Sequence, residues 1–119
     1  MRYQAFIQWT LLLTFCVILL GAYTRLSGAG LGCPDWPGCY GQIGVPDSAA
    51  EVTNKAYLQQ RPLEPAKGWA EMIHRYFAGA LGVMVIIIMF WSWQRRHAIN
   101  QSLWLPGTLL AVVILQALL

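Results

Sequence analysis

The chain alternates between long apolar stretches and polar segments in a pattern typical of membrane helices. Apolar residues dominate positions 5–23 and 72–93, and a third apolar stretch covers 103–119. Because a helix rises about 1.5 Å per residue, about 20 residues cross a bilayer core of about 30 Å. The pattern therefore predicts an all-α membrane protein with three transmembrane helices at these positions, forming a partial helical bundle.

Composition supports this prediction. Hydrophobic residues make up 57% of the chain and charged residues 11%, whereas an ordinary soluble domain is about 45–50% apolar and about 25% charged. This excludes an ordinary soluble domain, and it excludes a disordered chain, which needs low hydrophobicity and high charge. The net charge of +3 is too small to favour nucleic acid as a partner. The apolar stretches lead us to expect membrane lipid as the partner instead.

The first apolar stretch has an alternative interpretation as a secretory signal peptide. Arg2 could provide the basic start, and the small residues at 27–29 could form the cleavage site. However, the apolar run exceeds the usual length of a signal-peptide core, and Arg25 lies between the run and that site. We therefore favour a retained membrane helix over 5–23.

The third apolar stretch is still apolar at Leu119. A spanning helix normally ends in an interfacial anchor, and none follows here. We therefore expect residues 1–119 to be the amino-terminal portion of a longer membrane protein, inactive as a fragment alone.

The loops predict an orientation. The long loop 24–71 holds all five acidic residues, whereas the short second loop contains Arg95 and Arg96 and no acid. Arginine and lysine concentrate in cytoplasmic loops, which places Arg2, Arg95 and Arg96 on the cytoplasmic side. The loop 24–71 then lies on the outer, oxidising side.

Two of the three cysteines lie close together in this loop. Cys33 and Cys39 flank five residues that include two prolines and a glycine, so the chain can bend back and close a disulfide. Disulfides persist outside the cytoplasm. Because the chain has no Cys-x-x-Cys motif, we favour a structural staple, with a working redox pair as the alternative. Cys16 lies within the first apolar stretch and is most simply a small buried apolar residue.

The rest of the loop divides into two parts. Glycine and proline are frequent in its first half, which predicts turns and little helix. The composition of 47–60 permits a helix that Asp47 or Ser48 could cap. We expect Pro62 and Pro65 to break the chain before the second span.

Ionisable residues gather where the second apolar stretch begins. Glu71 and His74 are three positions apart and share a helical face, and Glu71 and Arg75 are four apart and could pair. Anchoring of a helix end is one interpretation of such residues. Ionisable residues that face the inside of a membrane bundle are also functional candidates.

Small residues follow His74 on its own face. Ala78 and Gly82 would let another helix approach closely, and the same bare surface could admit a flat porphyrin. A lone histidine does not specify a metal, since zinc usually needs three or four ligands. His97 should lie at the opposite membrane face and should not join His74.

Two motifs resemble the haem A synthase family. The sequence GAYTRLSGAGLGCPDWPGC at 21–39 resembles the first outer loop of that family, and EMIHR at 71–75 resembles its signature at the start of the second span. The two motifs at this spacing are more specific than either alone. The resemblance covers essentially all of the chain and about the first third of a family member.

The resemblance implies a fold and an activity. Family members have eight membrane helices in two related four-helix halves, each with two histidines that can ligate haem iron. They oxidise a methyl group of haem O to a formyl group, giving haem A for cytochrome oxidase. The resemblance thus implies haem O as substrate, haem b as a redox cofactor, the remaining helices of a longer protein and haem O synthase as partners, and a bacterial inner membrane location.

The resemblance also implies roles for individual residues. His74 matches the first axial histidine of the amino-terminal half, associated with the substrate haem, and would be the ligand to haem iron. Glu71 matches the acidic residue that assists the oxidation and would be catalytic. Cys33 and Cys39 match the cysteine pair of the loop, expected as a disulfide.

Two arginines and two other activities complete the hypotheses. Arg75 and Arg25 could bind haem propionates, as arginine binds carboxylates, or simply anchor helix ends. A non-catalytic haem-binding module of a membrane b-type cytochrome would explain His74 but not the loop motif. A membrane thiol oxidoreductase using Cys33 and Cys39 is the third hypothesis.

Overall fold

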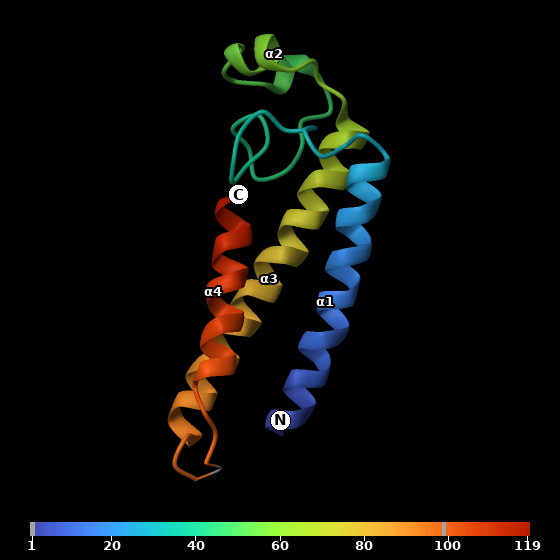
Figure 1. Ribbon diagram of the computed structural model, residues 1–119. Coiled ribbons are helices and arrows are strands. Elements are labelled where there is room, and N and C mark those ends of the chain that lie inside the picture. Colours follow the sequence, from blue (N-terminus) through green and yellow to red (C-terminus); the bar gives the residue numbers. More distant parts are fainter. Residues whose placement is uncertain (1, 99) are drawn as a thin grey trace. The chain divides into compact units, whose positions relative to one another are not determined.

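The computed structural model describes residues 2–98 and 100–119 and shows an all-α chain (Figure 1). Its elements, in order, are α1 (Tyr3–Leu26), the 3₁₀ turn η1 (Ala49–Glu51), α2 (Ala56–Gln60), α3 (Pro65–Arg95) and α4 (Trp104–Leu118). The predicted all-α class is confirmed. Helices α1 and α3 are long and apolar enough to cross a membrane, and α4 is a shorter apolar helix.

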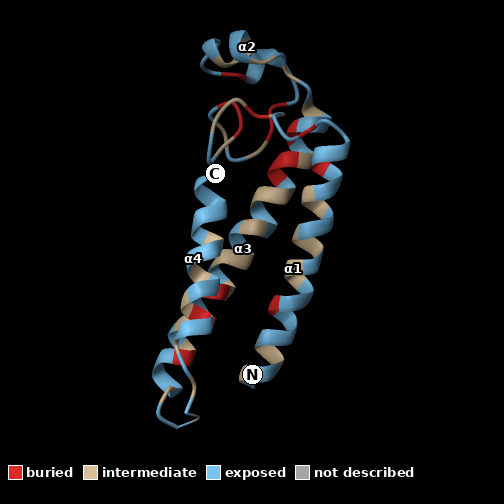
Figure 2. Cartoon of the chain, viewed as in Figure 1, coloured by how far each residue is buried: buried red, intermediate tan, exposed pale blue. Residues whose placement is uncertain are grey.

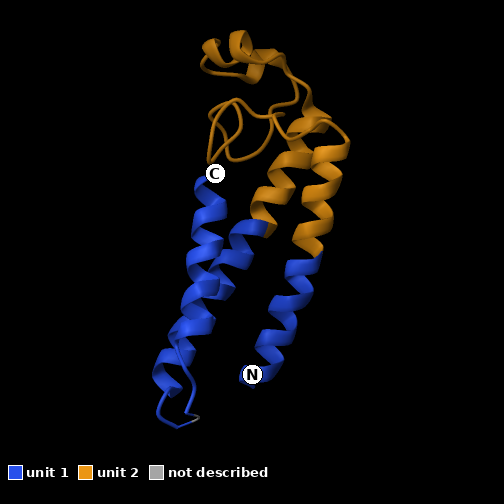
Figure 3. Ribbon diagram, viewed as in Figure 1, with its two compact units in different colours: residues 1–15, 78–119 blue, residues 16–77 orange. Residues whose placement is uncertain are grey.

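The chain divides into two compact units, coloured separately in Figure 3. The first unit is built from Met1–Phe15 and Ala78–Leu119, and the second from Cys16–Phe77. Helices α1 and α3 each contribute to both units. The second unit contains the long loop and most of the residues expected to carry chemistry.

Helix α1 satisfies its few polar side chains internally. The hydroxyls of Thr10, Thr14 and Thr24 each donate a hydrogen bond of 2.8 Å to the carbonyl four residues earlier, that of Phe6, Thr10 or Leu20. All three hydroxyls therefore donate within the helix and need no water as a partner, which suits a helix in apolar surroundings.

Most of the large apolar side chains of α1 are exposed, including Leu11, Phe15 and Ile18. A helix that is apolar all round is stable only where lipid or other protein segments cover it. The helix extends somewhat beyond the predicted span 5–23, because backbone hydrogen bonding continues to Leu26.

Helix α3 begins earlier than the sequence analysis predicted. The predicted break is present at 61–64, around Pro62, but it ends at Pro65, which starts the helix, and the predicted span 72–93 lies inside a longer helix. Proline is well suited to the first helical position, because its missing N–H has no partner there in any helix. Helix α4 likewise accommodates Pro106 in its first turn.

The predicted helix over 47–60 is largely wrong. Only η1 and α2 form, and Ser48 precedes η1 without a side-chain capping bond. Val52 interrupts the segment, because its backbone is extended (φ −74°, ψ 113°) and its side chain is buried. Burial of this one apolar side chain outweighs the weak helix preference of the surrounding residues.

Aromatic and polar side chains join α1 to α3 within the first unit. The Tyr3 hydroxyl lies 2.6 Å from the buried Ser92 Oγ, and the Tyr3 and Trp91 rings meet edge to face with centroids 5.5 Å apart. The guanidinium of Arg95 lies 5.3 Å from the centroid of Trp91, and that of Arg96 lies 5.4 Å from Trp93. These cation–π contacts lie at the carboxyl end of α3.

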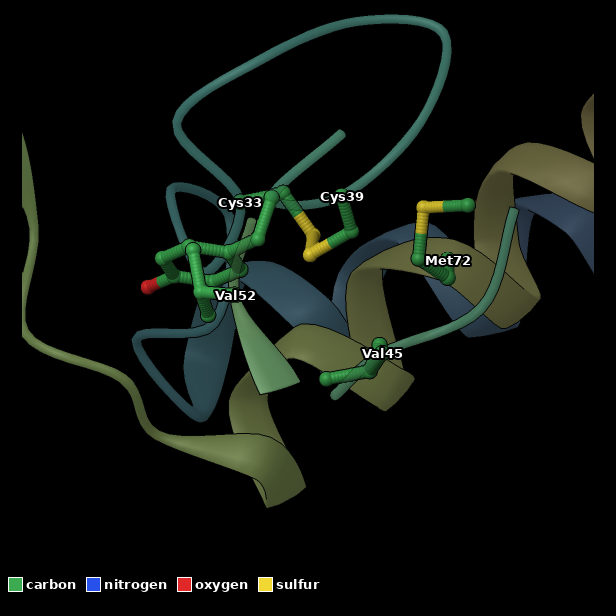
Figure 4. Packing of buried hydrophobic residues seen from close by; sticks show 6 residues of the cluster. Cys33, Cys39, Val45, Val52 and Met72 are labelled. Carbon is green, nitrogen blue, oxygen red and sulfur yellow. A yellow bond between two sulfur atoms is a disulfide. The ribbon is translucent and has the colours of Figure 1, made fainter. Parts of the chain in front are cut away.

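The second unit has a small core of its own. We call it the loop core; its members are Cys33, Cys39, Tyr40, Val45, Val52 and Met72, with Tyr57, Leu58 and Leu63 packed against it. Figure 4 shows the sulfur atoms of the disulfide beside Val52, with Met72 of α3 and Val45 close by. In Figure 2 the buried positions of this unit gather in the loop and in the nearby part of α3.

Candidate functional site

The predicted disulfide between Cys33 and Cys39 is present. The S–S distance is 2.10 Å and the two Cα atoms are 4.9 Å apart. Both cysteines are buried, with exposed fractions of 5% and 0%. Thiol exchange requires an attacking thiolate to reach a sulfur atom, so the burial of both cysteines favours the structural staple over a working redox pair. We call residues 33–39 the disulfide loop.

Asp35 organises the turn at the end of the disulfide loop. Its carboxylate accepts hydrogen bonds from the backbone N–H of Tyr40 (2.6 Å) and of Gly41 (2.9 Å). Both residues have positive φ, 53° and 77°, a conformation that is unfavourable for tyrosine and acceptable for glycine. The two hydrogen bonds compensate for this conformation and keep Tyr40 in the loop core.

Glu71 is a buried carboxylate that binds the disulfide loop. It is 7% exposed. One oxygen accepts a hydrogen bond from the backbone N–H of Cys33 (2.9 Å), and the other forms an ion pair with Arg75. The expected pairing of Glu71 and Arg75 is therefore confirmed, and it extends to a loop residue 38 positions away.

Arg75 completes this connection. Its Nη1 donates to the backbone carbonyls of Asp35 (3.0 Å) and Gly38 (2.8 Å), while its Nη2 pairs with Glu71. The guanidinium thus joins two loop carbonyls to the buried carboxylate. We call Glu71, Arg75 and these loop bonds the clamp, because together they fasten the disulfide loop to α3.

Two glycines allow the loop to approach α3 closely. A Cβ at Gly32 would lie 2.7 Å from the backbone of Lys67, and a Cβ at Gly68 would lie 2.8 Å from Val45. Neither position has room for a side chain without a shift of its neighbour. Glycine at these two positions therefore lets the loop come close enough to α3 for the clamp to form.

His74 lies beside α1. Its side chain is half-buried, and its ring packs against Gly21. Its Nδ1 atom is buried and has no hydrogen-bond partner among the described residues. Buried polar atoms nearly always have a hydrogen-bond partner, so a buried nitrogen without one is unusual and makes His74 a candidate functional residue.

Sequence analysis proposed Arg25 as a further site residue and excluded His97. Arg25 is exposed in the last turn of α1, and His97 follows the end of α3 in the first unit. Among the described residues, no three His, Cys, Asp or Glu side chains lie close enough together to hold a metal ion.

Tyr40 is the buried titratable group of the loop core. Burial raises the pKa of its hydroxyl above the ordinary value, and nearby Arg61 partly opposes this effect. The hydroxyl donates to the carbonyls of Pro62 (3.1 Å) and Arg61 (3.4 Å). Sequence analysis did not single out Tyr40, and only its place beside Cys39 hinted at burial.

An open groove of about 440 Å³ lies next to the disulfide loop. Its lining includes Trp36, Ile43, Met72 and Tyr76. His74 does not line it, so the groove and the histidine are separate features of the second unit.

The chain matches one family of known proteins. The model of the family described as cytochrome oxidase assembly protein matches residues 4–119. No solved structure matches the chain.

Individual relatives agree with this match. The chain is 57% identical over 82 residues to the heme A synthase of Shewanella oneidensis, an alignment that covers 68% of this chain and 25% of that protein. It is 30% identical over 105 residues to the heme A synthase of Shouchella clausii, with 87% and 29% covered. For the heme A synthase of Geobacillus kaustophilus the identity is 29% over 121 residues, with 98% and 33% covered. The chain thus spans about a quarter to a third of the length of these relatives.

Proposed function

The chain belongs to the family of cytochrome oxidase assembly proteins, and on that premise we propose that it is part of a haem A synthase. Such an enzyme oxidises a methyl group of haem O to a formyl group, supplying haem A to cytochrome oxidase. The names of the relatives support the proposal. Haem O is the proposed substrate, haem b the proposed cofactor, and haem O synthase a proposed partner.

The proposed setting is the bacterial inner membrane. The three spans are 5–23, 72–93 and 103–119, with the amino terminus in the cytoplasm and the loop 24–71 outside. The exposed apolar side chains of α1 support a lipid or helix surround. The disulfide supports the outer location of the loop, because disulfides persist in oxidising compartments.

His74 is the proposed axial ligand of the substrate haem. Neutral imidazole ligates haem iron well, and the half-buried ring of His74 suits that role. His74 would hold the haem through its imidazole, and the remaining helices of the protein would complete the site. The bound haems would contribute the iron redox chemistry of the oxidation.

Glu71 is the proposed catalytic carboxylate. It lies one helical turn before His74 on the same face of α3. Each of its oxygens accepts one protein hydrogen bond, which leaves a further lone pair on each. The carboxylate can therefore stabilise positive charge at the ring edge or accept a proton, while the clamp holds it in place.

The two arginines are proposed to contribute charge near the haem propionates. The exposed Arg25 has a side chain free to reach a ligand. Arg75 is bound to Glu71 and to loop carbonyls, so its first role is to hold the clamp. The single observation that carries the proposed function is that Glu71, which binds the disulfide loop, shares one helical face with His74 in a chain of this family.

Substitutions in the product of the complete gene test the proposal. We expect His74→Ala to abolish haem A formation and to remove the substrate haem. We expect Glu71→Gln to lower haem A formation by about 100-fold or more while haem remains bound. Haem extraction after growth and reduced-minus-oxidised spectra of the purified protein give the two readouts, and His97→Ala is the matched control.

The outcomes separate the competing functions. Haem A production by His74→Ala at the parental level would overturn the ligand assignment. Haem binding without any conversion of haem O in the unmodified protein would favour a b-type cytochrome module. Loss of haem in Glu71→Gln would make Glu71 a structural residue.

A further inference from the structure

The imidazole of His74 rests on the bare backbone of α1 at Gly21. A Cβ atom at Gly21 would lie 3.0 Å from Cε1, 3.5 Å from Nε2 and 3.6 Å from Nδ1 of His74. The first distance is tighter than nine in ten real Cβ contacts, so any side chain at this position would move the ring by a few tenths of an ångström.

Helix α1 is held close to α3 just beside this contact. The Thr24 hydroxyl, which donates to the Leu20 carbonyl at 2.8 Å, also lies 3.4 Å from the Ala70 carbonyl of α3. Thr24 is three residues from Gly21, and Ala70 is four residues from His74, so both pairs share helical faces. This contact holds the two helices close together one turn from Gly21 and His74.

No hydrogen bond to a described residue fixes the orientation of the His74 ring through Nδ1. A histidine that ligates a metal usually donates its second ring N–H to a partner that fixes the ring plane. The buried Nδ1 of His74 has no such partner. Packing against Gly21 is the restraint that the second unit provides in its place.

We propose that Gly21 is a positioning residue for the haem ligand His74, an inference that rests on the proposed function. Without a side chain at position 21, the ring occupies the space beside α1 and presents its ligating nitrogen in one direction. Axial ligation depends on that direction, and groups that orient metal-bound histidines contribute about 10–100-fold to metal affinity. Gly21 acts through His74 and does not itself contact the reacting atoms.

A graded series in the product of the complete gene tests the inference. We expect Gly21→Ala to weaken haem binding about 10-fold and to shift the electron paramagnetic resonance signal of the low-spin iron, and Gly21→Leu to do both more strongly. Gly107→Ala is the matched control, because a Cβ there meets nothing within 4 Å. His74→Ala is the reference for complete loss, and protease resistance of the disulfide loop reports on folding.

The possible outcomes separate the role of Gly21 from the proposed function of the chain. Parental haem affinity and signal in Gly21→Ala, with loss in His74→Ala, would overturn the role of Gly21 and leave the proposed function standing. Retention of the signal in His74→Ala would overturn the proposed function itself. Loss of loop protection in Gly21→Ala equal to the loss of haem would assign Gly21 to general helix packing and overturn the inference.

Discussion

Each of the two compact units is stabilised internally by a different set of interactions. In the second unit a disulfide, a buried ion pair and hydrogen bonds from loop backbone to side chains surround the loop core. In the first unit, ring contacts and the Tyr3–Ser92 hydrogen bond join helices whose apolar side chains are largely exposed.

This difference identifies which part of the chain carries its own stability. The loop core excludes water with its own residues, whereas helices with exposed apolar faces depend on lipid or on further helices. Of the residues proposed for chemistry, Glu71 and Arg75 bind the disulfide loop directly. Pre-organisation of a site requires this kind of support from neighbouring bonds.

Among the changes considered, breaking the clamp should lower the stability of the loop most, relative to that of the first unit. Arg75→Leu leaves the buried Glu71 carboxylate unpaired and two loop carbonyls without a donor, and we expect the loop to lose about 3 kcal/mol. Amide hydrogen exchange in detergent micelles measures the opening free energy of the loop and of the first unit separately. The first unit should keep its protection.

The control is the ion pair between Glu64 and Lys67, whose side chains are 49% and 45% exposed. Lys67→Met should change the same opening free energy by no more than about 0.5 kcal/mol. Equal effects of the two substitutions would show that burial does not distinguish the clamp from a surface pair.

Removing the disulfide should have a smaller effect. The bond closes a short loop, so Cys33→Ser combined with Cys39→Ser should lower loop stability by about 2 kcal/mol and leave part of the activity. Cys16→Ala, outside the loop, is the control. Complete loss of activity in a protein whose loop remains protected would instead favour the thiol oxidoreductase hypothesis.

Alkaline pH should have the smallest effect, and it should act on the second unit through Tyr40. Because burial raises the pKa of Tyr40, its contribution is fully present below the ordinary tyrosine pKa of about 10 and is lost as pH rises through the higher pKa of the folded protein. Tyr40→Phe should cost about 1 kcal/mol at neutral pH and remove this part of the alkaline transition. Loop protection measured against pH would contradict the assignment if both proteins lost it identically.

Local patterns predicted much of this structure. The apolar stretches predicted three helices, because apolar composition over such lengths leaves few other structures, and the spacing of Glu71 and Arg75 predicted their pair. The spacing of Cys33 and Cys39 permitted the disulfide. Each of these predictions depends on residues close together in the sequence.

Long-range contacts were beyond sequence reasoning. The Cys33 amide and the carbonyls of Asp35 and Gly38 carry no sequence signal, because every residue has these groups. The contact of Gly21 with His74 depends on how two helices face each other. The burial of Val52, which interrupts a permitted helix, likewise depends on the tertiary core.

The stacked arginines at the end of α3 have one further consequence. Arg95 and Arg96 lie over indole rings, and neither forms an ion pair with a carboxylate among the described residues. Indoles favour the zone of lipid headgroups, and guanidinium groups bind phosphates there. We therefore expect these four side chains to fix the axial register of α3, so that the helix resists sliding along the bilayer normal.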